Sequence, residues 1–236
     1  MHEHTQRTPW FEARDIARIA VFAALIAVLG LPGSVSLAGG VPITAQTLGV
    51  MLAGAVLGPR KGPLAVLVLM VLVAAGLPLL AGGRGGLAVF LGPTAGFLLG
   101  WILGAWAIGA IMHATARKPS MLRVMIAMLV GGVLVIHAVG LPVQALVTRL
   151  PLTETVLMGM VFVPGDLLKA VLATMVTVTL LRAYPRAFAR TWRPTGRTSG
   201  PAEPRPVAAA DDGAATAATA VGADAAPTTI RRAETE

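Results

Sequence analysis

The scarcity of acidic residues within a long apolar stretch constrains this chain more than any other feature. Between Ile19 and Leu181 the only acids are Glu154 and Asp166. Along this stretch, apolar runs repeat at close to the ~20 residues that a helix needs to cross about 30 Å of hydrocarbon. A water-soluble bundle of such helices would need polar faces, which are missing here. The sequence therefore predicts an all-α membrane protein.

Six transmembrane helices are predicted, because glycine or proline repeatedly interrupts the apolar stretch. The predicted segments cover residues 16–31, 46–57, 63–77, 93–114, 121–139 and 164–182, and a short helix is predicted at 154–162. Gly140-Leu141-Pro142 is predicted to end the fifth segment. The second and third segments are short for a straight crossing, so we expect them to pack inside a bundle rather than face lipid on all sides.

The basic residues indicate how these helices are oriented. With both termini in the cytoplasm, the segments on that side hold most of the basic residues: Arg7, Arg14, Arg18, Arg60, Lys61, Arg117, Lys118, Arg123, Arg182, Arg186, Arg190 and Arg193. The outer loops then hold only Arg84 and Arg149. This positive-inside asymmetry predicts a multi-pass protein of the cell membrane, in contact with membrane lipid. It also explains the net charge of +8 without a nucleic-acid partner, for which an aromatic content of 5% offers little base stacking.

Composition divides the chain into three regions. Residues 1–15 are predicted to form a cytoplasmic N-terminal segment, and residues 16–183 a transmembrane domain. Beyond about residue 194, alanine, proline, threonine and aspartate replace most large apolar side chains, so 194–236 is predicted to be a disordered cytoplasmic tail. The sequence holds no cysteine, which excludes disulfides, thiolate metal sites and a cysteine nucleophile.

Asp166 and Lys169 are the strongest candidates for a functional site. They lie three residues apart at the start of the sixth segment, so they share one helix face. An ionisable side chain at the centre of a bilayer costs at least about 2.5 kcal/mol, so such residues usually face a cavity or the bundle interior. The alternative is a structural ion pair that neutralises itself at the membrane interface.

Two further stretches carry candidate binding residues. Arg84 lies among four glycines, which include Gly85 and Gly86, in a predicted outer loop. The glycines allow the backbone to approach a ligand closely, and the guanidinium suits a carboxylate. The alternative is a flexible glycine turn with a solvated arginine. Gln46 can donate and accept hydrogen bonds at the mouth of the second segment, although a helix cap made with Thr44 is an alternative.

Small residues and histidines complete the set of candidates. Ala20 and Ala24 are four residues apart on the first segment, a spacing that lets another helix approach closely. Packing within the bundle is the simpler explanation, because alanine is common in membrane helices. His113 and His137 stand alone on different segments, so they are interpreted as structural, and no metal site is predicted.

Several strings together resemble the BioY family, the biotin-specific S components of energy-coupling-factor (ECF) transporters. They are Pro42-Ile-Thr-Ala-Gln-Thr-Leu-Gly-Val-Met-Leu-Ala-Gly with Leu57-Gly-Pro-Arg-Lys-Gly, Gly76-Leu-Pro, Gly82-Gly-Arg-Gly-Gly, Leu91-Gly-Pro-Thr-Ala-Gly-Phe and Pro164-Gly-Asp-Leu-Leu-Lys, in family order. The resemblance implies a six-helix S-component fold with a biotin pocket near the outer surface. It also implies a partner T subunit, on which Ala20 and Ala24 would dock. Two ABC-type ATPases would use the ATP, and this chain would need no cofactor.

The chemistry of biotin suits the candidate residues. The Asp166 carboxylate can accept from the N–H groups of the ureido ring, and Gln46 could add a hydrogen bond. Either Arg84 or Lys169 could hold the valerate carboxylate, and Lys169 could instead pair with Asp166 or donate to the ureido oxygen. The charges of Asp166, Lys169 and Arg84 add to +1, so an anionic ligand would give a neutral, filled pocket.

Three alternatives stay open from the residues alone. The chain could be the S component for another small vitamin, with the same fold. It could be a proton-coupled secondary carrier with Asp166 as relay, although such carriers often show internal repeats and none is found here. An intramembrane enzyme with Asp166 and Lys169 as an acid–base pair is the third. No nucleophile elbow, paired aspartates or metal motif supports an enzyme, so no catalytic activity is predicted.

Overall fold

Helices make up most of the computed structural model, which describes residues 13–31, 35–36, 42–114, 119–184 and 188. The helices are α1 (Ala13–Val28), α2 (Gln46–Ala74), α3 (Ala95–His113), α4 (Met121–Leu129), α5 (Ile136–Thr148), α6 (Leu152–Gly159) and α7 (Val163–Ala183). Two short antiparallel strands, β1 (Val35–Ser36) and β2 (Pro42–Ile43), were not predicted. Most of the predicted N-terminal segment and the whole predicted tail, 194–236, lie outside the described residues.

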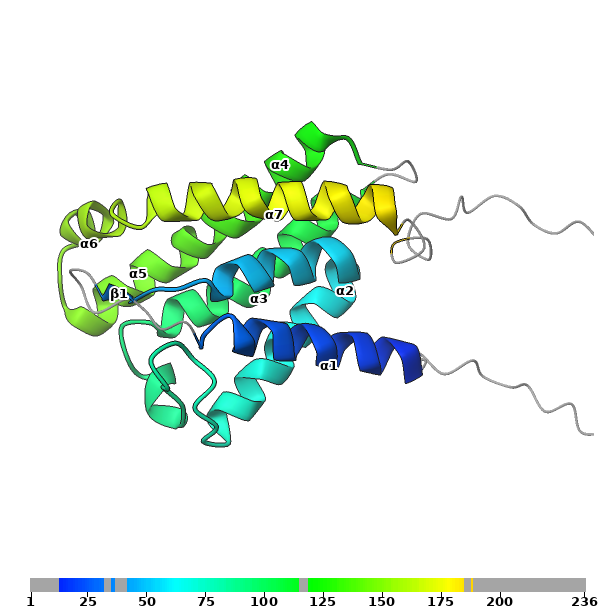
Figure 1. Cartoon of the computed structure of the whole chain (residues 1–236). Helices are drawn as coiled ribbons and strands as arrows, with labels where there is room; N and C mark the ends of the chain where they lie inside the picture. Colours follow the sequence, from blue (N-terminus) through cyan, green and yellow to red (C-terminus); the bar gives the residue numbers. More distant parts are fainter. Residues whose placement is uncertain (1–12, 32–34, 37–41, 115–118, 185–187, 189–236) are drawn as a thin grey trace, which may run out of the picture. The chain divides into compact units, whose positions relative to one another are not determined.

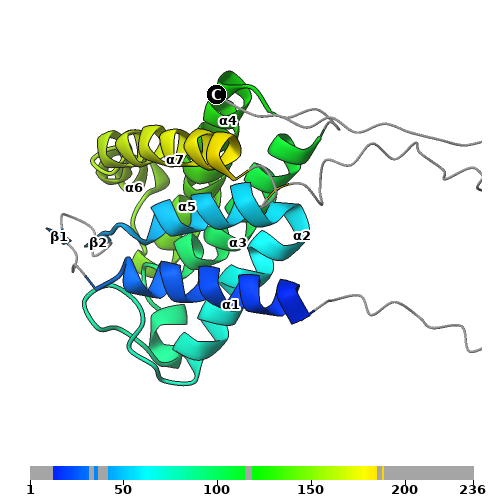
Figure 2. The ribbon, with the colours of Figure 1, turned by 45° about the vertical axis from the view of Figure 1, so that its right-hand side comes forward.

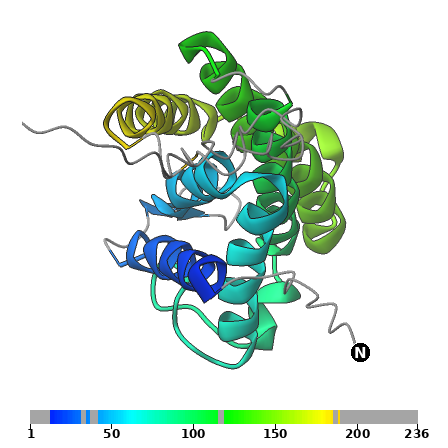
Figure 3. The same ribbon diagram turned by 90° about the vertical axis from the view of Figure 1, so that its right-hand side faces the viewer.

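The second and third predicted segments are two helices that meet at a sharp kink at Gly58, within the span labelled α2. This residue has φ +81° and ψ −175°, a conformation that essentially only glycine adopts, and Pro59 follows it. A Cβ placed on Gly62 would lie 2.9 Å from the Cα of Gly54, so the two arms of α2 pass very close to each other. Figure 3 shows the arms running in different directions. The predicted segments 46–57 and 63–77 therefore correspond to the two arms.

The predicted end of the fifth segment at Gly140-Leu141-Pro142 is wrong. After α4 the chain makes a π-helical turn (Val130–Val135) and continues as α5 through Pro142 to Thr148. A proline removes only one backbone hydrogen bond, and packed membrane helices tolerate this loss. Gly140 serves close packing instead, because a Cβ at this position would meet the ring of Phe97. Arg149, with φ 57°, ends the helix.

Glycines on α3 allow this helix to lie at the centre of the bundle. Gly96, Gly100 and Gly104 are four residues apart and face α5 and the π-helical turn. A Cβ on Gly100 would lie 2.9 Å from the carbonyl oxygen of Ile136. Small residues at this spacing let membrane helices pack backbone against backbone.

Four helical runs are long and apolar enough to cross a membrane within the described part of the chain. They are Gln46–Ala74, Ala95–His113, Met121–Thr148 and Val163–Ala183. The predicted number of six is not confirmed by these four runs, because the two helices on either side of the Gly58 kink form one run and α1 has only 16 residues. A helix of that length is about 24 Å long, which is short of the hydrocarbon thickness.

The two ends of the bundle differ in what they carry. In Figure 1, α1 begins and α7 ends on the right, and β1 and α6 lie on the left. Figure 2 shows β1 and β2 at this second end, beside the long connection between α2 and α3. At the first end, Lys61 next to the α2 kink forms an ion pair of 2.6 Å with Asp15 of α1. The start of α1 and the end of α7 therefore lie at the first end, and the two strands and the connection between α2 and α3 lie at the second.

Candidate functional site

A cavity opens among the loops at the second end of the bundle. It encloses about 580 Å³ of empty space, including the open solvent at its mouth. Its polar lining consists of Thr44, Gln46, Thr47, Arg84, Thr94, His137, Asp166 and Lys169. Its apolar lining consists of Leu80, Phe97, Leu98, Trp101, Ile136 and Phe162. Four of the six predicted ligand-contact residues are thus brought together: Gln46, Arg84, Asp166 and Lys169.

Asp166 and Lys169 form an ion pair on the wall of this cavity. Proline in the first turn of α7 starts the helix, and Asp166 follows in that first turn, where an acidic side chain is electrostatically favoured. The Lys169 Nζ lies 2.7 Å from the Asp166 Oδ1, and the two side chains are 14% and 10% exposed. The pair therefore belongs to a nearly enclosed site, and not to a solvated interface.

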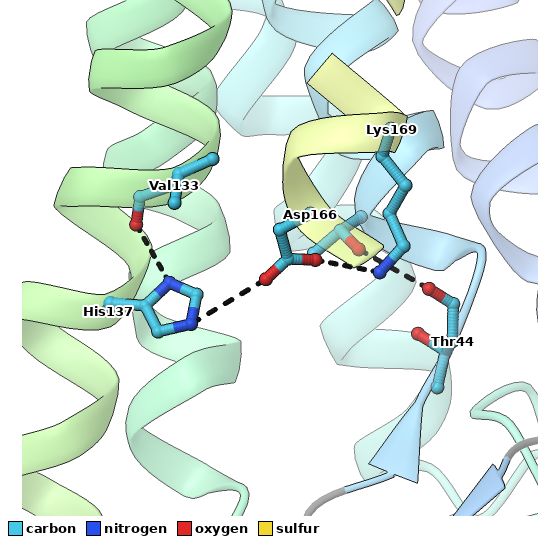
Figure 4. Close-up of polar contacts among 6 residues, drawn as sticks. Thr44, Val133, His137, Asp166 and Lys169 are labelled. Carbon is cyan, nitrogen blue, oxygen red and sulfur yellow. Dashed lines mark hydrogen bonds and ion pairs between the residues drawn. The ribbon is translucent and has the colours of Figure 1, made fainter. Parts of the chain in front are cut away.

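His137 lies on the other side of the Asp166 carboxylate, as Figure 4 shows. Its Nε2 is 3.6 Å from the Asp166 Oδ2. Its Nδ1 is 2.9 Å from the carbonyl oxygen of Val133, and a carbonyl can only accept, so Nδ1 carries a proton. The ring also meets the edge of Phe97. The interpretation of His137 as a purely structural residue missed this position, and no local spacing on its own helix would have revealed it.

Arg84 is held in a tight backbone turn at the cavity. The backbones of Leu80 and Arg84 exchange two hydrogen bonds, of 3.0 and 3.2 Å, and the Arg84 Nε donates to the Ala81 carbonyl at 3.2 Å. Gly82 and Gly83 between them have positive φ. Burial lowers the pKa of Arg84 from its usual value. Within the described chain, no carboxylate lies within ion-pair distance of its guanidinium. Arg84 is therefore half-buried in a hydrogen-bonded turn, unlike the solvated arginine of the alternative interpretation.

Gln46 is 1% exposed, and its amide is already engaged. Its Nε2 donates to the carbonyls of Ile26 and Leu79, at 3.2 and 3.0 Å. Its Oε1 accepts from the Ala81 N–H at 2.9 Å. The alternative of a helix cap made with Thr44 does not describe this amide, because its bonds go to Ile26, Leu79 and Ala81 and α2 has no side-chain cap bond. Whether Gln46 also contacts a ligand stays a prediction.

The remaining candidates lie outside the cavity lining. Gly85 is backed by the Leu77 carbonyl, and Gly86 has φ +81°, so both shape the loop. Their predicted ligand contacts stay predictions. Ala20 and Ala24 are exposed on the outer face of α1.

His113 contacts the Ala55 carbonyl at 3.2 Å and lies beside Gly58, away from the cavity lining, as a structural histidine would. Among the described residues, no group of three or more histidine or acidic side chains could hold a metal ion.

Comparison with known proteins identifies the family. The sequence profile of the BioY family matches residues 2–186. The chain belongs to the BioY family. Among curated BioY proteins, the biotin transporter BioY of Rhizobium etli is 45% identical over 183 residues, which cover 75% of this chain and 98% of that protein. The biotin transporter BioY of Rhodobacter capsulatus is 45% identical over 185 residues, which cover 74% and 97%.

A solved structure agrees with the fold. The chain resembles the crystal structure of an S-component for biotin from an ECF-type ABC transporter, with a TM-score of 0.72 and 30% identity. The similarity covers 76% of this chain and 96% of the solved one. The expected resemblance to the BioY family and to an S-component fold is confirmed.

Proposed function

We propose that this chain binds biotin at the outer face of the cell membrane and serves its uptake as the S component of an ECF-type transporter. The observation that carries the proposal is the Asp166–Lys169 pair, which is turned into a cavity at the end of the bundle away from its termini. The names of its BioY relatives agree with this ligand.

The Asp166–Lys169 pair complements the ureido ring of biotin. A ureido group presents an N–H donor directly beside a carbonyl acceptor. The pair presents a carboxylate acceptor and an ammonium donor 2.7 Å apart. The carboxylate can therefore accept from the ureido N–H while the ammonium donates to the ureido carbonyl. Hydrogen bonds to charged groups are stronger than neutral ones, so this edge of the ring is the natural partner of the pair.

Arg84 is the better partner for the valerate carboxylate. Lys169 already faces Asp166, whereas the guanidinium of Arg84 uses only its Nε among the residues that the structure describes. The terminal nitrogens of a guanidinium form the planar fork that binds a carboxylate at two points. An arriving carboxylate would also offset the burial of this cation. Phe97, Trp101 and Phe162 of the same cavity lining supply apolar wall for the thiophane ring and acyl chain.

The charges favour an outward-facing cavity. The described basic residues Arg14, Arg18, Arg60, Lys61, Arg123 and Arg182 lie near the start of α1, the α2 kink, the start of α4 or the end of α7. The other described basic residues, Arg84, Arg149 and Lys169, lie at the cavity end. With the positive-inside rule, both termini are cytoplasmic. The two arms of α2 and the short α1 then complete six membrane-embedded helical arms.

We infer that transport needs partner subunits. The described chain holds no nucleotide-binding loop, and the solved structural neighbour is a component of an ECF-type ABC transporter. A T subunit and two ABC-type ATPases would couple ATP hydrolysis to uptake, and this chain would be neither an enzyme nor in need of a cofactor. The exposed alanines of α1, Ala20 and Ala24, offer a close docking face for the T subunit.

Titration of the purified protein in detergent with biotin tests the proposal. Saturable binding of one biotin that persists in excess thiamine or riboflavin is expected. Binding of another vitamin in place of biotin would indicate an S component of different specificity. Biotin uptake that an uncoupler abolishes and that does not depend on ATP would indicate a proton-coupled carrier.

A further inference from the structure

We propose that Gln46 is a positioning residue, which holds the Arg84 turn in place and so makes the site selective for a ligand that carries a carboxylate. The inference rests on the proposed function, since it names the residue that prepares the carboxylate end of the same site. It assigns Gln46 a role through Arg84 rather than through direct ligand contact.

The hydrogen bonds of Gln46 join three separate segments. Its two amide protons go to the end of α1, at Ile26, and to the loop after α2, at Leu79. Its oxygen takes the N–H of Ala81 in the same loop. A primary amide has two N–H donors, so Gln46 has none left for a ligand. Only one lone pair of its oxygen is without a partner.

Ala81 links Gln46 to the guanidinium. The N–H of Ala81 is fixed by Gln46, and the carbonyl of the same residue accepts from the Arg84 Nε at 3.2 Å. The turn between Leu80 and Arg84 is closed by two further backbone hydrogen bonds. Two of the three bonds of Gln46 therefore end on the short loop whose shape decides where the Arg84 guanidinium lies.

The surroundings prevent the Gln46 amide from turning. A Cβ placed on Gly30 would lie 2.9 Å from both the Cδ and the Nε2 of Gln46, so the amide rests directly on backbone. At 1% exposure, water cannot replace a lost partner from the solvent side. Loss of the amide would leave buried carbonyls and an N–H unpaired, and the loop would shift to satisfy them.

The test compares biotin with biotinamide, in which a neutral amide, with one oxygen acceptor and a donating NH₂ group, replaces the carboxylate. In the full-length protein in detergent, Gln46→Met is expected to weaken biotin binding about 10-fold or more and biotinamide binding less than about 3-fold. Arg84→Gln should show the same selectivity. The double variant should bind biotin no more weakly than Arg84→Gln alone, within about 2-fold, because both changes remove one interaction.

Matched variants separate this role from general stability. Gln144→Met removes another buried glutamine, on α5 and outside the cavity lining, and should leave the ratio of the two affinities unchanged. Gly83→Ala strains the Arg84 turn at φ +69°, where no atom lies within 4 Å of the added methyl group. Gly83→Ala should weaken biotin binding more than biotinamide binding, as Gln46→Met does. If Gln46→Met does not fold, this variant tests whether the shape of the turn sets the preference for a carboxylate.

Equal losses for biotin and biotinamide, or additive effects of the Gln46 and Arg84 changes, would overturn the inference. An unaltered protein that binds no biotin would refute the proposed function itself, and the inference with it.

Discussion

Replacement of Asp166 by asparagine tests the ureido end of the site while changing very little volume. Asparagine keeps one oxygen and exchanges the other for a donating NH₂ group, which would face the donors of Lys169 and of the ligand. The nearby charges change from +1 to +2 when Asp166, Lys169 and Arg84 are counted. The perturbation therefore removes a charged acceptor and leaves its neighbouring cation without compensation.

The expected loss follows from the kind of bond that is removed. A hydrogen bond to a charged group contributes about 1.5–3 kcal/mol, so Asp166→Asn should weaken biotin binding roughly 10- to 150-fold. Isothermal titration in detergent measures this change. Glu154→Gln, on the exposed face of α6, removes the other acid of the membrane region and should leave the affinity unchanged. A dissociation constant of Asp166→Asn within about 2-fold of the unaltered protein would refute the assignment.

The same variant should lose some stability, because both side chains of the pair are nearly buried. Removal of one partner of a buried pair leaves the other as an uncompensated charge. The double variant Asp166→Asn/Lys169→Gln should therefore regain part of the thermal midpoint without regaining biotin affinity. Recovery of binding together with stability would show that the carboxylate acts only through the fold.

Three further changes test other parts of the molecule. Ala20→Trp should leave biotin affinity within about 2-fold but block biotin uptake in cells that contain the partner subunits, because the indole occupies the exposed face of α1. Gly104→Leu should lower the free energy of unfolding by about 1–3 kcal/mol, and the thermal midpoint with it, since a Cβ there would lie 2.6 Å from the Gly131 carbonyl oxygen. Lys61→Met should lower the free energy of unfolding by roughly 1–3 kcal/mol, because it breaks the ion pair with Asp15. It should leave biotin affinity unchanged, because this pair is at the far end of the bundle from the cavity.

These changes have direct controls. Val21→Ala, a change on the exposed part of α1 that adds no bulk, should permit normal uptake. Leu103→Ala, at an exposed position on α3, should have little effect on unfolding. Normal uptake by Ala20→Trp would remove the docking argument. Unchanged midpoints for Gly104→Leu or Lys61→Met would contradict the packing and the ion pair, respectively.

The sequence was sufficient to predict most of the helices. Apolar length and the positions of glycine and proline located α1, α3 and α7 to within about three residues. The same signals wrongly predicted a helix end at Gly140 and Pro142. Sequence alone does not distinguish a glycine that ends a helix from one that makes room for a neighbouring ring, as Gly140 does for Phe97. The break predicted between the second and third segments is where the backbone leaves the helical conformation, at Gly58.

The charged part of the site was also predictable, because a charge inside an apolar stretch is expensive and therefore informative. Asp166, Lys169 and Arg84 all line the cavity. His137 was not found, since it reaches Asp166 only through the relative rotation of α5 and α7. The hydrogen bonds of Gln46 were equally hidden, because its partners lie 20 to 35 residues away along the chain.

A structure of this chain with biotin bound would test the proposed site most directly. The ureido ring is expected within hydrogen-bond distance of Asp166 and Lys169, and the valerate carboxylate on the terminal nitrogens of Arg84. A biotin molecule bound in the reverse direction, with its carboxylate on Lys169, or bound outside this cavity, would contradict the proposed arrangement.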